Sequence, residues 1–94
     1  MMTDLELQTV RDFILRAAAK FPRGITSLTL GTAVAAAGFE LDPRGQDSLE
    51  AQLRYLVGRG LLADQPKAHT ASLELYVLTP AGDDYLRRLK LPAA

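Results

Sequence analysis

The pattern of apolar and polar positions near the start of the chain is that of an amphipathic helix. Apolar residues recur at the three- and four-residue spacing of one helical face. The residues on this face are Val10, Phe13, Ile14, Ala17, Ala18 and Phe21. The segment "TDLE", Thr3 to Glu6, fits a capping box before them, and Pro22 follows them. We therefore predict a helix over about residues 4 to 20.

A second, alanine-rich helical pattern follows "GITS", a segment long enough for one bridge at the edge of a sheet. Ser27 or Thr29 is placed to cap this helix, and Gly38 is placed to end it. Its expected inner face consists of Leu30, Ala33, Val34 and Ala37.

A third helix is predicted over about residues 47 to 59, after a turn that Asp42-Pro43 begins and Gly45 completes. Asp47 is placed at its N-cap, and Gly60 comes directly after its end. Its expected buried residues are Leu49, Leu53, Leu56 and Val57. The spacing of these residues excludes a strand.

The remaining pattern predicts a hairpin and a last helix. Leu61 to Asp64 and Leu73 to Leu78 have the pattern of two short strands, with residues 65 to 72 as the loop between them. Thr79 and Pro80 suit the start of a helix. Acidic residues come first in it and basic residues last, as the helix dipole favours: Asp83, Asp84, Arg87, Arg88 and Lys90. Its expected inner contacts are Tyr85, Leu86 and Leu89.

The predicted order is helix, strand, helix, helix, strand, strand, helix, in a single domain over residues 1–94 that is mainly α with a small antiparallel β-hairpin. The segments "LRYLVGRGLL" and "YVLTPAGDDYL" resemble the end of the recognition helix and the strand-to-helix junction of bacterial winged-helix regulators. "FILRAAAKFPRG" with "LRYLVGRGLL" is also similar to small winged-helix proteins of Mu-like prophages, although the loop "ELDPRGQ" is longer than theirs. The resemblance implies a winged helix-turn-helix that binds DNA and regulates transcription.

Composition adds little support for DNA binding. The 11 basic and 11 acidic residues cancel, whereas nucleic-acid-binding domains usually carry a basic excess. The chain has no cysteine, which excludes disulfides, thiolate metal sites and thiol catalysis. No apolar run approaches the roughly 20 residues of a membrane span, and acidic residues near the N-terminus disfavour export. We expect a cytoplasmic protein with no membrane partner.

The winged-helix resemblance implies that the helix at 47–59 and the wing at 65–72 contact double-stranded DNA. The implied contact residues are Arg44, Gln46, Ser48, Gln52, Arg54, Tyr55, Lys67 and His69. A homodimer joined by its first or last helix would place two such helices about 34 Å apart, one helical turn of DNA. His69 fits a solvated loop residue better than a metal ligand, since the chain has no other histidine and no cysteine.

An alternative interpretation is a winged-helix module that binds protein and no nucleic acid. The zero net charge favours it, as do Glu50 and Ala51 on the surface that would face DNA. Tyr55, Tyr76 and Leu78, if exposed, would then anchor the partner. A third interpretation, a small-ligand sensor, has no supporting feature, and we expect little room beyond the core.

We expect neither catalysis nor a bound cofactor. The chain lacks a nucleophile–base arrangement, a phosphate-binding glycine loop and metal-ligand spacing. Asp83 and Asp84 do not form a carboxylate pair, because adjacent side chains on a helix point about 100 degrees apart. Their place near a helix N-terminus accounts for them.

Overall fold

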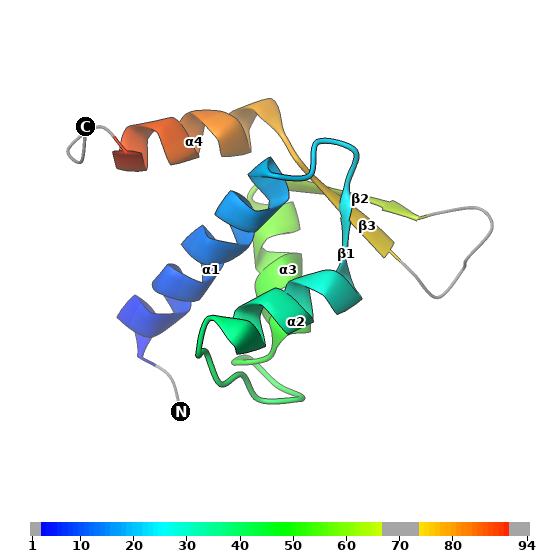
Figure 1. The fold of residues 1–94 in the computed structure, drawn as a ribbon. Coiled ribbons are helices and arrows are strands. Elements are labelled where there is room, and N and C mark those ends of the chain that lie inside the picture. The colour runs from blue at the N-terminus through cyan, green and yellow to red at the C-terminus, as the bar shows by residue number, and fades with distance from the viewer. Residues whose placement is uncertain (1–2, 67–73, 91–94) are drawn as a thin grey trace.

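The computed structural model describes residues 3–66 and 74–90. Its elements are α1 (Asp4–Ala19), β1 (Ile25–Thr26), α2 (Ser27–Ala36), α3 (Leu49–Gly58), β2 (Leu62–Pro66), β3 (Glu74–Leu78) and α4 (Pro80–Lys90). The predicted order of elements is confirmed, and a mainly helical chain with a small three-stranded antiparallel sheet is consistent with a winged helix. In Figure 1, α4 crosses above α1, and α2 lies below the sheet.

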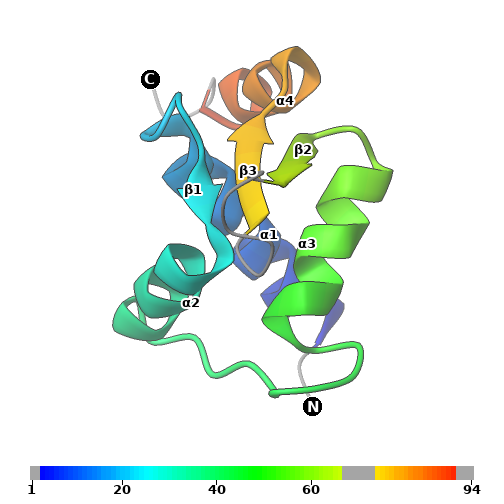
Figure 2. The same cartoon turned by 90° about the vertical axis from the view of Figure 1, so that its right-hand side faces the viewer.

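The sheet has the strand order β1-β3-β2, so the last strand in the chain is the central one. Figure 2 shows β3 between its two neighbours, with α2 and α3 on either side below the sheet. The predicted edge bridge is confirmed as β1, where Ile25 pairs with Tyr76. β2 continues to Pro66, two residues beyond the prediction, and pairs with Glu74 there. Gln65 and Pro66 therefore belong to a strand and not to the loop.

Every helix and the sheet contribute to one core. Its buried apolar residues are Val10, Ile14, Leu15, Ala18, Ile25, Leu30, Val34, Leu53, Leu56, Leu62, Tyr76 and Leu86. The prediction for Phe21 is wrong, because α1 ends at Ala19 and Phe21, beyond its last turn, is 45% exposed. The prediction missed Leu15, which is fully buried because other elements cover α1 on more than one side. Ala37 is exposed because it caps α2 instead of continuing its inner face.

The helix caps follow the predicted chemistry, in two cases one residue away from the predicted position. The capping box of Thr3 and Glu6 is confirmed. α2 is capped by Thr26, not by Ser27 or Thr29, because the extended backbone of β1 reaches Thr26 and leaves its hydroxyl 3.1 Å from the Thr29 amide.

At α3 the N-cap is Ser48, and the prediction of Asp47 is wrong. The Ser48 hydroxyl accepts from the Ala51 amide at 3.1 Å and donates to the Gly45 carbonyl at 2.8 Å. The helix therefore covers Leu49–Gly58, shorter at each end than predicted. Gly60, with φ 75°, follows the C-cap residue Arg59 as predicted.

The start of α4 is joined tightly to the end of α3. Thr79 caps α4 as predicted, since its hydroxyl accepts from the Gly82 amide at 3.0 Å, and it also donates to the Gly60 carbonyl at 2.6 Å. Gly82 is buried so closely that an added Cβ would lie 2.3 Å from the Leu61 carbonyl oxygen. Tyr85, Leu86 and Leu89 face the core, as predicted.

Candidate functional site

Helix α3 separates two recesses of opposite character. One lies between α3 and α2, and the other lies between α3, α1 and α4. We call the first the α2–α3 groove, because residues of both helices and of the loop between them line it. We call the second the arginine pocket, because Arg11 and Arg59 line it.

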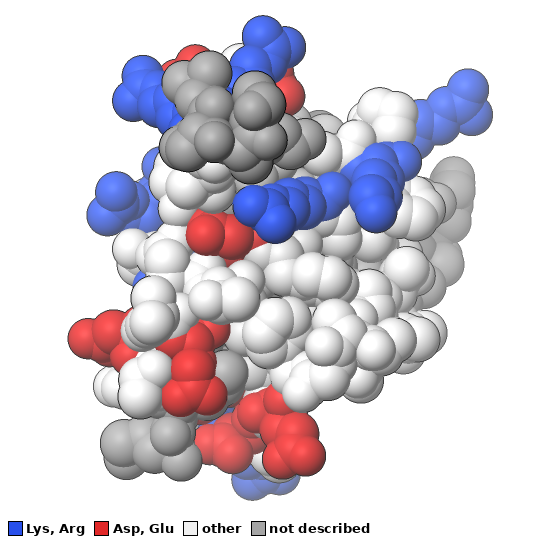
Figure 3. All heavy atoms as spheres, turned by 60° about the vertical axis from the view of Figure 1, so that its left-hand side comes forward, with Lys and Arg blue, Asp and Glu red and all other residues white. Residues whose placement is uncertain are grey.

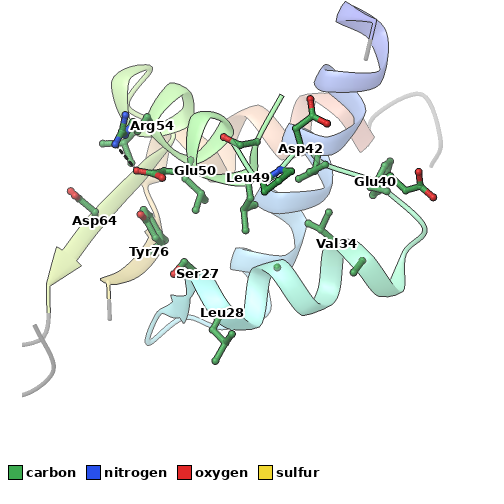
Figure 4. Close-up of a pocket in the computed structure, with 18 of the residues that line it drawn as sticks. Ser27, Leu28, Val34, Glu40, Asp42, Leu49, Glu50, Arg54, Asp64 and Tyr76 are labelled. Atoms are coloured by element: carbon green, nitrogen blue, oxygen red, sulfur yellow. Dashed lines mark hydrogen bonds and ion pairs between the residues drawn. The ribbon is translucent and has the colours of Figure 1, made fainter. Parts of the chain in front are cut away.

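The α2–α3 groove has a volume of about 1060 Å³, so the expectation of little room beyond the core is wrong. Its floor is apolar: Figure 4 shows Val34 of α2 and Leu49 of α3 pointing toward each other between the helices. Leu53 and Val57 continue this floor along α3. Leu28, which is 72% exposed, lies at the outer edge and extends the apolar surface.

Carboxylates surround this apolar floor. Glu50 and Asp64 lie at the end near the sheet, and Glu40 and Asp42 lie at the end formed by the loop (Figure 4). Arg54 is the only cation among the described residues that line the groove, and its guanidinium is ion-paired with Glu50. The groove therefore combines apolar contact surface with negative potential.

A buried glutamine organises the opposite side of α3. Gln52 is 1% exposed, and its amide nitrogen donates to the Gln46 carbonyl at 2.7 Å and to the Ser48 carbonyl at 3.2 Å. These bonds leave its amide oxygen to accept from Arg11 Nε at 2.9 Å. Gln52 thereby fixes the loop before α3 and one arginine of the pocket at the same time.

Tyr55 forms the centre of the arginine pocket. The guanidinium carbon of Arg11 lies 3.7 Å from the centroid of its ring, and that of Arg59 lies 5.8 Å from it. Both distances are in the range of cation–π contact. The pocket is small, about 110 Å³.

A hydrogen-bond network around the Asp12 carboxylate closes the arginine pocket on the α4 side. The Tyr85 hydroxyl donates to Asp12 Oδ1 at 2.9 Å, and the Gln8 amide donates to the Tyr85 hydroxyl at 2.7 Å and to the same Asp12 oxygen at 2.9 Å. Burial, and then the hydrogen bond to Asp12, raise the pKa of Tyr85 above its ordinary value of 10.0. Tyr85 therefore stays protonated as a donor.

The residues predicted to contact DNA are distributed over several environments. Arg44 and Gln46 are exposed on the loop before α3, and Arg54 and Tyr55 are exposed on α3 itself. Ser48 and Gln52 are buried, so the polar surface expected from them is not formed. Lys67 and His69 lie outside the described residues.

The burial of Gln52 had a signal in the sequence. It stands three residues after Leu49 and four before Leu56, which is the spacing of the inner face of α3. By contrast, Arg11 and Arg59 are far apart in the chain, and only the packing of α1 against α3 brings them to one ring. Of the anchors expected for a protein partner, Tyr55 is exposed, but Tyr76 is buried because its strand is the central one. Leu78 is half-buried against the core.

The zero net charge conceals a segregated distribution. On the face shown in Figure 3, blue basic side chains gather in the upper part, most red acidic ones in the lower part, and a wide uncharged area lies between them. The first turn of α1 carries Asp4 and Glu6, and its last turn carries Arg16.

Comparison with protein-family models, with curated proteins and with solved structures finds no match to this chain. The likeness to winged helices therefore rests on the order of the elements and the topology of the sheet. In the described ranges, no helix has the combination of length and apolar character that a membrane span needs.

Proposed function

We propose that this chain is a winged-helix module that binds another protein through the α2–α3 groove. The observation that carries the proposal is the apolar floor of the groove with carboxylates at both of its ends. Apolar area removed from water supplies a driving force for binding, about 25 cal/mol per Å². The carboxylates then favour apolar segments that carry cations at matching positions.

The partner that fits best is an amphipathic helical segment with lysine or arginine near both ends of its apolar face. Its apolar side chains would pack against Leu49 and Val57, as helices in grooves do elsewhere. Its cations would face Glu50 and Asp64 at one end and the acidic loop at the other. Charge complementarity of this kind selects the partner and speeds its association.

The same features disfavour DNA as the ligand. In a winged helix that binds DNA, the N-terminal part of the recognition helix, here α3, enters the major groove, and the wing contacts phosphates or the minor groove. Here Asp64, on the strand that leads into the wing, would be brought near phosphates, with an unfavourable Coulomb energy. Arg54, the cation of this surface, is already paired with Glu50.

DNA binding by a winged-helix regulator is the second candidate. One observation favours it: Arg44 and Gln46 are exposed directly before the N-terminus of α3, the end that enters the major groove in this fold. Arg54 and Lys67 would then add phosphate contacts, and Arg54→Ala and Lys67→Ala should each weaken duplex binding and reduce its salt dependence.

A direct test uses a fluorescent synthetic helix of about 15 leucine and lysine residues as the probe. We expect saturable binding to the wild-type protein, and about tenfold weaker binding to Glu50→Lys, a change of about 1.4 kcal/mol. Asp84→Lys is the matched control. Asp84 is also an exposed helical carboxylate paired with an arginine four residues on, so the change in charge and the lost ion pair are the same.

Binding to Asp84→Lys should stay within about twofold of the wild type, and a probe with glutamate in place of lysine should not bind. Equal weakening by the two variants would refute the groove as the site. A parallel measurement of anisotropy with a mixed-sequence duplex at about 50 and 200 mM salt tests the second candidate. Saturable binding that weakens steeply with salt would overturn the proposal in favour of DNA.

A further inference from the structure

The arginine pocket brings two guanidinium groups to one aromatic ring without a carboxylate to neutralise either. In the described ranges, the ion pairs join Arg54 to Glu50, Arg87 to Asp83 and Arg88 to Asp84. Arg11 and Arg59 form none. We propose that these two arginines form a binding site for a phosphate group, separate from the α2–α3 groove and independent of the function proposed for it.

Arg11 is held in place before any ligand arrives. Its Nε donates to the oxygen of the buried Gln52, and its guanidinium stacks 3.7 Å from the centre of the Tyr55 ring. The Nε bond leaves the two terminal nitrogens of Arg11 as donors. A guanidinium fixed in this way loses less conformational entropy on binding than a free surface arginine would.

Arg59 supplies the second charge from the end of α3. Its guanidinium carbon lies 5.8 Å from the centroid of the same ring. Arg59 is the C-cap residue of the helix; its backbone amide donates to the Tyr55 carbonyl at 3.0 Å, and the next amide, of Gly60, donates to the Val57 carbonyl at 3.0 Å. The backbone that carries it is therefore anchored, while its side chain is exposed and able to close over a ligand.

The other residues that line the arginine pocket are apolar or already hydrogen-bonded, so the guanidinium groups are the donors that would bind the phosphate. Leu15, Leu56 and Leu61 are apolar. Gln8 and Tyr85 line the pocket too, but their hydrogen bonds are directed to one another and to Asp12. Asp12 accepts two of these hydrogen bonds and is not among the residues that line the pocket.

The size and charge of the pocket select the class of ligand. A volume of about 110 Å³ admits one oxyanion, either free or as the end group of a ligand that extends into solvent. Two guanidiniums balance the near-double negative charge of a phosphate monoester or of inorganic phosphate, and their planar donors match its oxygens. Chloride carries a single negative charge and has no set of oxygen acceptors that could match the planar donors of two guanidinium groups.

The test is a titration of the full chain with inorganic phosphate at constant ionic strength, maintained with chloride. The Nε–Hε signals of the arginines, observed by 1H–15N NMR, report on each guanidinium. We expect saturating shifts at Arg11 and Arg59, with a dissociation constant of about 1 mM. Binding to Arg59→Gln should be at least about tenfold weaker, and Arg16→Gln, an exposed α1 arginine, should bind like the wild type.

Shifts that rise linearly without saturation would overturn the proposal, and so would equal shifts at Arg16 or unchanged binding to Arg59→Gln. Phosphoserine titrated in the same way distinguishes the two sources of phosphate: tighter binding than inorganic phosphate indicates an esterified ligand. Because Glu50→Lys alters only the α2–α3 groove, it should leave phosphate binding unchanged, so a failure of this site and a failure of the groove are separable.

Discussion

The two sides of α3 differ in what they face. On the side of α2, the helix faces an open groove with an apolar floor and an acidic rim. On the side of α1 and α4, its residues meet hydrogen-bonded polar side chains, two arginines and a closely packed turn. The first side offers surface that is not used within the described chain, whereas most of the second side is occupied by internal contacts.

The difference explains why a helix can be placed like a recognition helix and still present few polar or basic side chains that could contact DNA. Polar residues on α3 that a sequence-based interpretation assigns to DNA include Ser48 and Gln52, and both are used to hold the loop before the helix. The outward charges, Glu50 and Arg54, neutralise each other. Among the described residues, the groove side is then left with apolar area and with three carboxylates that form no ion pair: Glu40, Asp42 and Asp64.

The largest expected effect comes from adding one methyl group to the packed side. Gly82→Ala would place a Cβ 2.3 Å from the Leu61 carbonyl oxygen and 2.7 Å from Leu78 Cδ1. We expect a loss of about 3 kcal/mol in the free energy of unfolding, measured by urea denaturation. The matched variant on the open side is Gly31→Ala, whose Cβ would lie an ordinary 3.5 Å from Leu49 Cδ2.

Gly31→Ala should stabilise the protein by about 0.5–1 kcal/mol, because both glycines are helical and alanine has the higher helix propensity. Opposite signs for the two variants would establish the contrast in packing. Equal effects on stability would show that the two sides of α3 are equally tolerant, contrary to the structure.

A second variant tests whether the buried glutamine supports the polar side. Gln52→Leu has nearly the same volume but leaves the Gln46 carbonyl and Arg11 Nε without their partner. We expect a loss of about 2 kcal/mol in unfolding free energy. The Arg11 Nε–Hε signal should also exchange faster with water. Gln46→Ala is the control, since only the backbone of Gln46 takes part, and a similar loss there would contradict this role of Gln52.

The smallest effect concerns the tyrosine network beside the arginine pocket. Tyr85→Phe removes two hydrogen bonds and should cost about 1 kcal/mol at neutral pH. Tyr55→Phe is the control and should change stability by less than about 0.5 kcal/mol, because its hydroxyl makes no hydrogen bond within the described residues.

The pH dependence of stability gives a second measurement on Tyr85→Phe. The pKa of Tyr85 is raised in the folded protein, so the folded state holds its proton more tightly than the unfolded chain does. This contribution to stability is fully present below about pH 10 and is lost as the pH rises through the folded value. Unfolding midpoints of Tyr85→Phe should therefore fall less than those of the wild type between about pH 9 and 11. Parallel profiles would contradict the assignment.

Much of the fold could be predicted because local chemistry and periodicity agree in this chain. The capping box at Thr3, the cap at Thr79 and the apolar spacing of α1 and α3 each indicate an element by themselves. Errors arise where a helix ends before its apolar spacing does, and where tertiary packing decides burial. Phe21 continues the apolar spacing of α1, but the helix ends before it. Tyr76 is buried because β3 pairs on both edges, which its own alternation does not show.

The candidate sites were much harder to predict. The groove depends on how far α2 and α3 stand apart over the loop at residues 37–48, and no residue type in that loop encodes the distance. The arginine pocket joins residues that are 48 positions apart in the chain, Arg11 and Arg59. The winged-helix resemblance assigns Gln52 to the DNA-contacting surface, although its helical phase places it inside.

The junction of Thr79 and Gly82 has a consequence for how relatives of this chain would be found. The hydroxyl of Thr79 ties two chain segments together, Pro80 starts a helix, and Gly82 admits no side chain. The structure of the junction therefore accounts for Thr79, Pro80 and Gly82 in "TPAG" without reference to a ligand. A search that relies on this signature will collect proteins that share an architecture, and their ligands can be as different as the surfaces they present on either side of α3.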